Sequence, residues 1–386
     1  MGSYFLPFPP YYHYQTKRSY RGKAVERVQT FSIGPRIYFG GDALAALEAL
    51  AGRRVLVVTD SFLASSGLLD RVLSRLTGPV EVFSQVEPDP SLELVARGVA
   101  ALRAFRPDAV VAFGGGSPMD CAKGMVWAAG AAPAERPPLW CIPTTAGTGS
   151  EVTAFAVLTD RQRGVKIPLI EEGLIPQAAI LDPGPLEGVP PRVTADTGMD
   201  VLTHAAEAYV ARGASPFSDA LAEKAFALAW RSLPRAYGGD LEAKGEMLLC
   251  SCMAGMAFQA AGLGLCHAAA HALGGRFHVP HGRLNGVLLP HVIAFNAAGG
   301  EQTAARYGRL ARACGLAGSP RALAAALVRL RAGLGIEGGL PIPAEELRAA
   351  LPQVAADALA DPCAAGDPRT PSAQDVERLI EEAAGG

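Results

Sequence analysis

Four of the seven histidines in this chain fall within fifteen residues, inside the stretch Gly262–Gly282 that reads GLGLCHAAAHALGGRFHVPHG. They are His267, His271, His278 and His281. The first two are four residues apart in an Ala-rich segment, so a helix would place both rings on one face. Beyond them, Gly274-Gly275 predicts a break in that helix and Pro280 predicts a turn. A lone buried histidine is usually a satisfied core residue, but so dense a group indicates a metal site, because imidazole is the commonest metal-ligating side chain.

A second pair that could bind a metal lies upstream, where Asp200 and His204 are again four residues apart on a predicted helix. A helix cap and an ordinary surface pair are the structural alternatives for these two residues. Together with His267 and His281 they form one carboxylate and three neutral imidazoles, a plausible ligand set for a divalent first-row metal. Such a site keeps one net positive charge. That charge suits the polarisation of a bound oxygen and the stabilisation of an alkoxide, so the set favours a catalytic metal over a structural one.

A glycine-rich segment, GGGSPMDCAK at 114–123, follows directly on a predicted strand and opens a predicted helix. Its three glycines let the backbone approach a ligand closely, and the helix N-terminus offers free N–H groups to a phosphate. The spacing is not the G-x-G-x-x-G of the ordinary dinucleotide fingerprint. A tight strand-to-helix turn without a ligand is the structural alternative.

A second loop, PTTAGTGSEVT at 143–153, also follows a predicted strand and places several hydroxyl groups on a flexible backbone. It lacks the Gly-Lys-Ser/Thr of a P-loop, which argues against nucleotide hydrolysis and leaves a plain polar loop as the alternative. Two such loops at strand ends fit a pyrophosphate in the crevice of an open α/β sheet.

Asp60 ends the strand after which an acidic residue commonly contacts the adenosine ribose. Its carboxylate would repel a 2′-phosphate, so the sequence predicts a preference for NAD(H) over NADP(H). A plain turn-forming role is the alternative for this residue.

The elements that would hold these residues alternate between strands and helices in the N-terminal half. Strands are predicted at Phe31–Phe39, Arg54–Asp60, Val80–Phe83, Ala109–Phe113, Leu139–Ile142 and Ala178–Leu181. Helices are predicted at Asp42–Leu50, at Ser91–Phe105 and from the glycine-rich segment to Trp127. This alternation predicts a parallel sheet flanked by helices.

The composition changes after about Pro190, where long Ala- and Leu-rich segments predict an all-helical half. Examples are Ser215–Leu233, Glu246–Ala260 and Pro320–Leu334. We therefore predict an α/β dinucleotide-binding domain over residues 31–190 and a helical metal- and substrate-binding domain over residues 191–386. Residues 1–30 are rich in Tyr and Pro and lack both helical periodicity and an apolar signal-peptide core, which predicts a disordered leader.

The overall composition argues against several function classes. With 35 basic and 37 acidic residues the formal charge is -2, which indicates neither nucleic acid nor an anionic membrane surface as a partner. No apolar run approaches the roughly 20 residues of a membrane span. The seven cysteines are odd in number and scattered, which favours a reducing, cytoplasmic setting.

Four motifs, taken together and in this order, resemble the iron-containing alcohol dehydrogenases from about Phe31 to the C-terminus. They are GGGSPMDCAK at 114–123, PTTAGTGSEVT at 143–153, TGMDVLTH at 197–204, and CHAAAH followed by PHG between 266 and 282. Within the family, FSDALAEK at 217–224 and GRFHVPHG at 275–282 resemble the propanol dehydrogenases of propanediol-degrading bacteria. The resemblance implies a Rossmann-like dinucleotide-binding domain followed by an all-α domain, the fold shared with dehydroquinate synthase.

The resemblance also implies roles for individual residues. The implied metal ligands are Asp200, His204, His267 and His281, holding Fe2+, with Zn2+ as the alternative because the intrinsic affinity order favours it. His271 would lie near the nicotinamide as a catalytic residue. The coenzyme residues would be Gly115, Gly116 and Ser117 at the pyrophosphate, Thr144 and Thr145 along the nucleotide, Lys166 at the ribose, and Asp89 on the adenosine side, where the family more often has Asn.

By the same resemblance Phe155, Phe258 and Cys363 would line the substrate pocket, and Leu263 lies close in sequence to the first implied metal-binding histidine of its stretch. Core packing without substrate contact is the alternative for Phe155. An apolar wall offers no partner to a second hydroxyl, which predicts short straight-chain aldehydes and primary alcohols such as propanal and propanol as substrates. The alternatives are a lactaldehyde, 1,2- or 1,3-propanediol oxidoreductase and a zinc-dependent glycerol-type dehydrogenase. More distant alternatives are a dehydroquinate-synthase-like lyase and a non-enzymatic metal-binding assembly subunit. A homodimer or larger homo-oligomer is expected, in the cytoplasm, with the interior of a bacterial microcompartment as the alternative.

Overall fold

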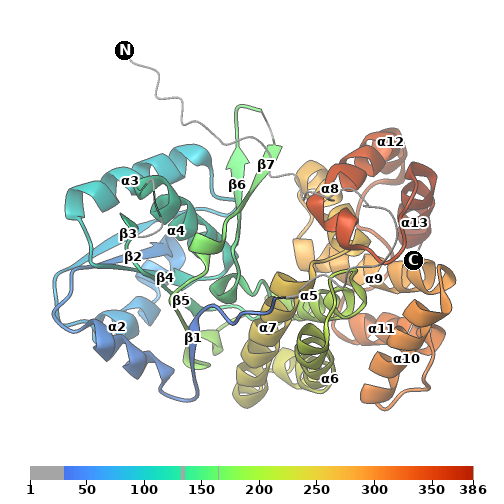
Figure 1. Cartoon of the computed structure of the whole chain (residues 1–386), viewed down its shortest axis with the longest axis horizontal. Helices are drawn as coiled ribbons and strands as arrows, with labels where there is room; N and C mark the ends of the chain where they lie inside the picture. The colour runs from blue at the N-terminus through green and yellow to red at the C-terminus, as the bar shows by residue number, and fades with distance from the viewer. Residues whose placement is uncertain (1–29, 131, 133–134, 164, 386) are drawn as a thin grey trace, which may run out of the picture. The chain divides into compact units, whose positions relative to one another are not determined.

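Six parallel strands form the sheet of the N-terminal half (Figure 1). The structure is a computed structural model and describes residues 30–130, 132, 135–163 and 165–385. The strands are β1 (Arg36–Phe39), β2 (Val55–Asp60), β3 (Val80–Val86), β4 (Ala109–Gly114), β5 (Leu139–Pro143) and β8 (Ala178–Leu181), in the order β1-β8-β5-β4-β2-β3. The predicted leader, residues 1–30, lies outside the described residues except for Thr30.

The central strands are apolar along most of their length because helices cover both faces of the sheet. On β2, Leu56 and Val58 belong to the core on one face, and Val55 and Val57 to the core on the other. The covering helices are α3 (Leu92–Phe105) and α4 (Gly116–Ala129) on the first face, and η1 (Ala43–Leu50), α1 (Ser61–Ser65) and α2 (Leu68–Leu73) on the second. The predicted α/β architecture is confirmed.

The order of the strands places a switch point beside β2. The next strand in sequence, β3, pairs with one side of β2, and β4 pairs with the other side. The connections therefore leave β2 and β4 in opposite directions, which opens a crevice at their carboxyl ends. The glycine-rich segment begins at the end of β4, and the Thr-rich loop begins at the end of the neighbouring β5.

A separate antiparallel hairpin, which the sequence analysis did not predict, joins β6 (Phe155–Asp160) to β7 (Val165–Ile170). Ser91, the N-cap of α3, bridges to Thr159 on β6. The hairpin therefore positions both Phe155 and Lys166, two residues of the predicted pocket and coenzyme site.

Only helices and connecting segments follow Pro191 within the described residues. They are α5 (Pro191–Val210), α6 (Pro216–Tyr237), α7 (Leu241–Ala261), α8 (Leu265–Phe277), α9 (His281–Ala298), α10 (Glu301–Ala313), α11 (Pro320–Gly333), α12 (Ala344–Ala360), η6 (Pro362–Gly366) and α13 (Ala373–Gly385). The prediction of an all-helical half is confirmed. Among the described residues no single helix has the length and hydropathy of a membrane span, and α7 with α8 passes that test only as a pair bent by 105°.

α5 is the central helix of this half. It is buried from Thr194 to Val210 except for Thr197, and it packs against α6, α7 and α9. Hydrogen bonds join the two halves of the chain, from Ala154 N–H to Gln259 Oε1 (2.8 Å) and from Lys244 Nζ to the Leu186 carbonyl (2.9 Å). α5 begins at Pro191, but Ser32–Gly386 forms one compact unit, so the division into domains at 190/191 stays a prediction.

Some predicted boundaries were wrong. β1 begins at Arg36 rather than Phe31, and the segment after it is a 3-10 helix. Gly274 and Gly275 do not break the helix, because α8 continues through them to Phe277. Glycine costs the interior of a helix only about 1 kcal/mol relative to alanine, and the packing of the buried residues of α8 overrides so weak a bias. α8 ends instead at His278, whose φ of 55° is left-handed.

Candidate metal and coenzyme site

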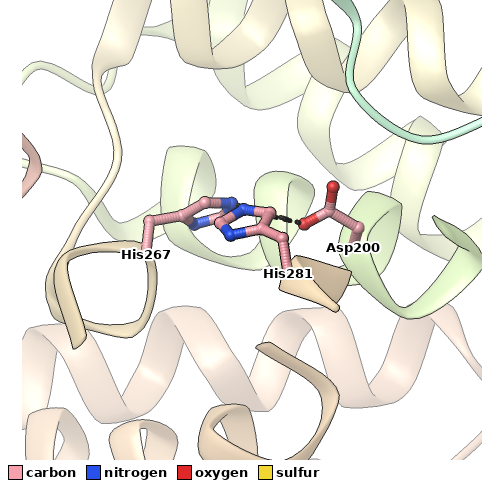
Figure 2. A group of neighbouring side chains, drawn as sticks. All are labelled: Asp200, His267 and His281. Carbon is pink, nitrogen blue, oxygen red and sulfur yellow. Dashed lines mark ion pairs between the residues drawn. The ribbon is translucent and has the colours of Figure 1, made fainter. Parts of the chain in front are cut away.

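Three of the predicted metal ligands converge from three helices. Asp200 lies on α5, His267 lies on α8, and His281 is the first residue of α9. Figure 2 shows the two imidazole rings beside the Asp200 carboxylate. Nε2 of His267 lies 3.6 Å, and Nε2 of His281 lies 3.5 Å, from the same Asp200 Oδ1. The potential ligand atoms of this group lie within 4.8 Å of one another, close enough to share one ion.

The chemistry of this group fits a cation. His267 Nε2 is buried and has no hydrogen-bond partner among the described residues, although a buried polar atom normally has one. Asn285 on α9 donates from Nδ2 to Asp200 Oδ1 (2.7 Å) and lies 3.0 Å from His281 Nε2, which therefore accepts and carries a lone pair. Nitrogen and oxygen donors of this kind suit Fe2+ and Zn2+ alike.

His204, the fourth predicted ligand, lies beside this group without belonging to it. Its ring stacks on that of His267 with centroids 4.4 Å apart, and its Nδ1 is 4.0 Å from Asp200 Oδ2. That Nδ1 is buried with no hydrogen-bond partner in the described part of the chain, and the ring bonds to the backbone of Gly147. The unpartnered nitrogen is compatible with ligation, but His204 as a ligand remains a prediction.

Burial and neighbouring charges set the protonation of these side chains. Burial raises the pKa of Asp200, but the neighbouring rings of His204, His281 and His267 outweigh it and hold this pKa well below its usual range. Burial lowers the pKa of His204 to about 3 and that of His281 well below its ordinary value. An ionised carboxylate and neutral imidazoles are the forms that bind metals.

His267 differs from the other two histidines. Burial lowers the pKa of His267, but the neighbouring carboxylates of Asp200 and Glu207 outweigh burial and raise this pKa to about 9. A metal that binds His267 must therefore displace a proton from it.

Two carboxylates that the sequence analysis did not single out contact the histidines. Glu207 Oε2 lies 2.6 Å from His267 Nδ1, and Asp361 Oδ2 lies 2.9 Å from His271 Nδ1. Glu207 follows His204 by three residues on the same helix face, a spacing that could have identified it. Asp361 is 90 residues from His271, and no sequence pattern connects them.

His271 lies one turn after His267 on α8 and stacks on His281 with ring centroids 5.0 Å apart. Its partner Asp361 also accepts the backbone N–H of Cys363 (2.8 Å), at the start of η6. Potential ligand atoms of His271, Asp361 and Cys363 lie within 4.8 Å of one another. Because the ring and the carboxylate already satisfy each other, we interpret this second group as an oriented histidine.

The two predicted phosphate loops face each other at the carboxyl ends of β4 and β5. Gly115 is the N-cap of α4, and Gly116 and Ser117 open its first turn, whose N–H groups have no partners within the helix. A Cβ at Gly115 would lie 3.2 Å from Thr145 Oγ1, so little space separates the loops. Thr144 is buried and donates its backbone N–H to the Gly114 carbonyl (3.0 Å). The arrangement places free N–H groups and hydroxyls at the switch point of the sheet.

Asp89 and Lys166, which are predicted to contact the adenosine side and the ribose of the coenzyme, form an ion pair with an N–O distance of 2.8 Å. Asp89 has a left-handed φ of 54°, and Lys166 lies on β7. Asp60 ends β2 and is the N-cap of α1, where its Oδ1 accepts the N–H of Leu63 (2.8 Å). One carboxylate oxygen of Asp60 therefore has the turn-forming role that was the alternative for this residue. The coenzyme roles of these three side chains remain predictions.

The predicted substrate wall lies against the histidines. The ring of Phe155 meets that of Phe258 edge-on at 6.3 Å between centroids, and Phe258 stacks on His204 at 4.6 Å. Leu263 is half-buried between α7 and α8, and Cys363 lies beside the Asp361–His271 pair. The structure therefore gathers apolar side chains around the metal group, although it does not test their contact with a substrate.

Comparison with known proteins identifies the family. Residues 34–183 match the family model described as iron-containing alcohol dehydrogenase, and residues 194–384 match the C-terminal model of the same family. This chain belongs to the iron-containing alcohol dehydrogenases. The resemblance drawn from the motifs is confirmed, and with it the predicted enzyme class, an NAD-dependent alcohol dehydrogenase of the iron-containing family.

Individual relatives within the iron-containing alcohol dehydrogenases span nearly the whole chain. The chain is 43% identical to the 1-propanol dehydrogenase PduQ of Salmonella typhimurium over 92% of this chain and 100% of that protein. It is similar to the iron-containing alcohol dehydrogenase of Thermococcus thioreducens, with a TM-score of 0.87, 32% identity, and 92% and 99% of the two chains covered. A third match is the sulfoacetaldehyde reductase of Bifidobacterium kashiwanohense in complex with NAD+, with a TM-score of 0.84, 28% identity, and 93% and 99% covered.

Proposed function

We propose that this enzyme transfers hydride between NAD(H) and short straight-chain primary alcohols or aldehydes, with propanol and propanal as the preferred pair. The observation that carries the proposal is the apolar ring pair Phe155–Phe258, in which Phe258 stacks on His204 and Phe155 packs edge-on against Phe258. A substrate oxygen at the histidines would place its alkyl chain against these rings. The full-length similarity to a 1-propanol dehydrogenase supports the same substrate class.

We propose Asp200, His204, His267 and His281 as the residues that hold the metal. When bound, it supplies a Lewis acid that polarises the carbonyl and favours the alkoxide after hydride transfer. Asp200 contributes the anionic ligand, and Asn285 fixes one of its oxygens through the bond to Oδ1. The buried setting of Asp200 and His267 excludes water, which strengthens every electrostatic interaction at the site.

His271 is the proposed proton carrier. Its Nδ1 bonds to the Asp361 carboxylate, so that nitrogen holds the proton and Nε2 is left as an acceptor. The side chain is 35% exposed, which lets it exchange protons with solvent. Nε2 can then receive the proton of the alcohol during oxidation and return one to the alkoxide during reduction.

The coenzyme is proposed to bind across the switch point, with its pyrophosphate at Gly115, Gly116 and Ser117. Free N–H groups at the start of a 14-residue helix favour an anion there. Thr144 and Thr145 border this position, while Asp89 and Lys166 lie on the adenosine side. The carboxylate of Asp60 favours NAD(H), because a 2′-phosphate would be repelled.

Assembly and location extend the proposal. We propose a homodimer or larger homo-oligomer, which the edge strand β1 supports because it leaves Phe39 67% exposed. All seven cysteines are free thiols, which supports a reducing compartment such as the cytoplasm. The interior of a microcompartment stays the alternative.

The test is a steady-state comparison of kcat/KM for propanal, butanal, lactaldehyde and glycerol, each with NADH and NADPH where reduction is measured, on iron-reconstituted enzyme. The proposal expects propanal or butanal with NADH to give the highest value. A higher value for lactaldehyde or glycerol would favour the diol or glycerol alternatives. Family membership already favours a dehydrogenase over a lyase and over a non-enzymatic metal-binding subunit.

A further inference from the structure

A buried carboxylate, Glu207, lies on the face of α5 that carries the proposed ligands. Asp200, His204 and Glu207 are spaced by four and three residues, so they share one face of the helix. Glu207 is 1% exposed, and among the described residues its ion-pair partner is His267 rather than a lysine or arginine. A buried carboxylate is costly unless its oxygens are hydrogen-bonded, so its contacts define its role.

Among the described residues, the hydrogen bonds of this carboxylate go to the first turn of α8. Oε1 accepts the backbone N–H of Cys266 at 2.6 Å. Oε2 lies 2.6 Å from Nδ1 of His267 and 3.4 Å from the backbone nitrogen of the same residue. Glu207 therefore holds both the helix end and the imidazole ring.

The contact at Nδ1 determines which ring nitrogen of His267 is available to bind a metal. An ionised carboxylate only accepts hydrogen bonds, so Nδ1 must carry the hydrogen in this contact. The other nitrogen, Nε2, is buried without a hydrogen-bond partner in the described part of the chain and lies 3.6 Å from Asp200 Oδ1. It is the nitrogen that points into the group of proposed ligands (Figure 2).

We propose that Glu207 is a positioning residue of the metal centre, which holds His267 with its hydrogen on Nδ1 and thereby turns the Nε2 lone pair toward the metal. This inference rests on the proposed metal site. It also changes the charge at that site. With Asp200 and Glu207 counted together, the two buried carboxylates balance a divalent ion, so the surplus positive charge inferred from the ligands alone is neutralised within the buried shell.

Replacing Glu207 by Gln tests the orientation of the ring because it exchanges one acceptor oxygen for a donor. If the amide oxygen keeps the bond to Cys266 N–H, the amide nitrogen faces His267 Nδ1 and donates to it. Nδ1 then carries the lone pair, and Nε2 carries the hydrogen and cannot bind a metal. The opposite amide orientation would place two donors, the amide and Cys266 N–H, only 2.6 Å apart.

Asp367 provides a matched control at the same helix end. It is also buried, and its Oδ1 accepts the backbone N–H of Leu265 (2.9 Å) and the amide of Asn296 (3.0 Å). A Cβ at Gly264 would clash with both Asp367 and Glu207, so the two carboxylates lie side by side at the start of α8. Within the described part of the chain the hydrogen bonds of Asp367 go to Leu265, Asn296 and Arg369 and not to a histidine ring, so Asp367→Asn removes a neighbouring charge without altering the ring.

The experiment measures the Kd of Zn2+ and of Fe2+ by competition with a chelator in full-length wild type, E207Q, D367N and D200A. We expect E207Q to weaken binding by about 10- to 100-fold, the size typical of a lost carboxylate–histidine bond. D367N should keep the wild-type Kd even if its Tm changes. A purely structural role for Glu207 would lower Tm and leave the Kd unchanged, and that result would overturn the inference.

Two further measurements keep the test decisive. If D200A binds metal as wild type does, the proposed metal site itself is wrong, whereas a loss in D200A without any change in E207Q disproves only the role of Glu207. If E207Q does not fold, 15N NMR of the histidine rings in zinc-loaded wild type decides instead. We expect a hydrogen on Nδ1 of His267 and zinc on Nε2. Zinc on Nδ1, or Nδ1 without a hydrogen, would contradict the inference.

Discussion

We expect the side chain of Phe155 to determine which substrate the enzyme prefers. It packs edge-on against Phe258, which stacks on His204. A second hydroxyl buried against this wall would lose about 1–3 kcal/mol of hydrogen bonding. In Phe155→Asn, an amide becomes available to that hydroxyl.

We expect the ratio of kcat/KM for propanal over lactaldehyde to fall by about one to two orders of magnitude in Phe155→Asn. Phe39→Asn, an exposed phenylalanine on β1, is the control and should keep the wild-type ratio. An unchanged ratio in Phe155→Asn would mean that Phe155 belongs to the core and that the preference arises from other residues.

Residue type and spacing were enough to propose metal ligands but not the partners of those residues. Asp200, His204, His267 and His271 could be paired because each pair is four apart on one helix, and His281 followed from the same stretch. The spacing of Glu207 from His204 could place it on the same helix face, but its partner His267 lies 60 residues away and could not be predicted. Asp361 could not be distinguished from an ordinary carboxylate, because its partner lies 90 residues away. Only the fold shows which histidine ring each carboxylate contacts.

At the scale of one element, the carboxyl group of Asp367 at the N-terminus of α8 should make the stability of the protein depend on pH. Burial, followed by the charge of Glu207, raises the pKa of Asp367 to about 6, against the hydrogen bond from Leu265 N–H that lowers it. The folded state therefore binds this proton more tightly than the unfolded chain does. Its contribution to stability is complete below about pH 4 and is lost as the pH rises through about 6.

The shift corresponds to about 3 kcal/mol. We expect the free energy of unfolding of the wild type to fall by about this amount relative to D367N between pH 4 and pH 7, because D367N has no proton to lose. Denaturant unfolding of the two zinc-loaded proteins across this range measures the difference. Parallel curves would show that Asp367 titrates normally in the folded protein.

Elements were predictable where periodicity and burial agree. β2 and β4 are nearly continuous apolar runs between covered faces, and α6, α7 and α11 follow long Ala- and Leu-rich segments. The β6–β7 hairpin was missed because its connection lacks an Asn-Gly or Asp-Gly turn and because Pro168 lies within β7. The two glycines inside α8 were misread because local propensity is weaker than packing.

At the scale of the whole chain, the proposed function requires both the proposed coenzyme site of the α/β half and the proposed metal site of the helical half. The N-terminus of α4 at the switch point between β2 and β4 is the proposed pyrophosphate site, and α5, α8 and α9 bring together Asp200, His267 and His281. The ring sequence from His267 through His204 and Phe258 to Phe155 connects the helical half with the hairpin of the α/β half. Family membership establishes that such a chain is an NAD-dependent alcohol dehydrogenase.

The most direct test is to remove and restore the metal while the rate of NADH-dependent propanal reduction is followed. After treatment with a chelator, the bound metal is quantified by elemental analysis and the rate is measured as Fe2+ or Zn2+ is added back, in wild type and in Asp200→Ala. We expect the rate of the wild type to fall with metal loss and to return in proportion to the metal regained, and we expect Asp200→Ala to bind no metal and to stay inactive. Full activity in wild-type protein that contains no metal would contradict the proposed centre.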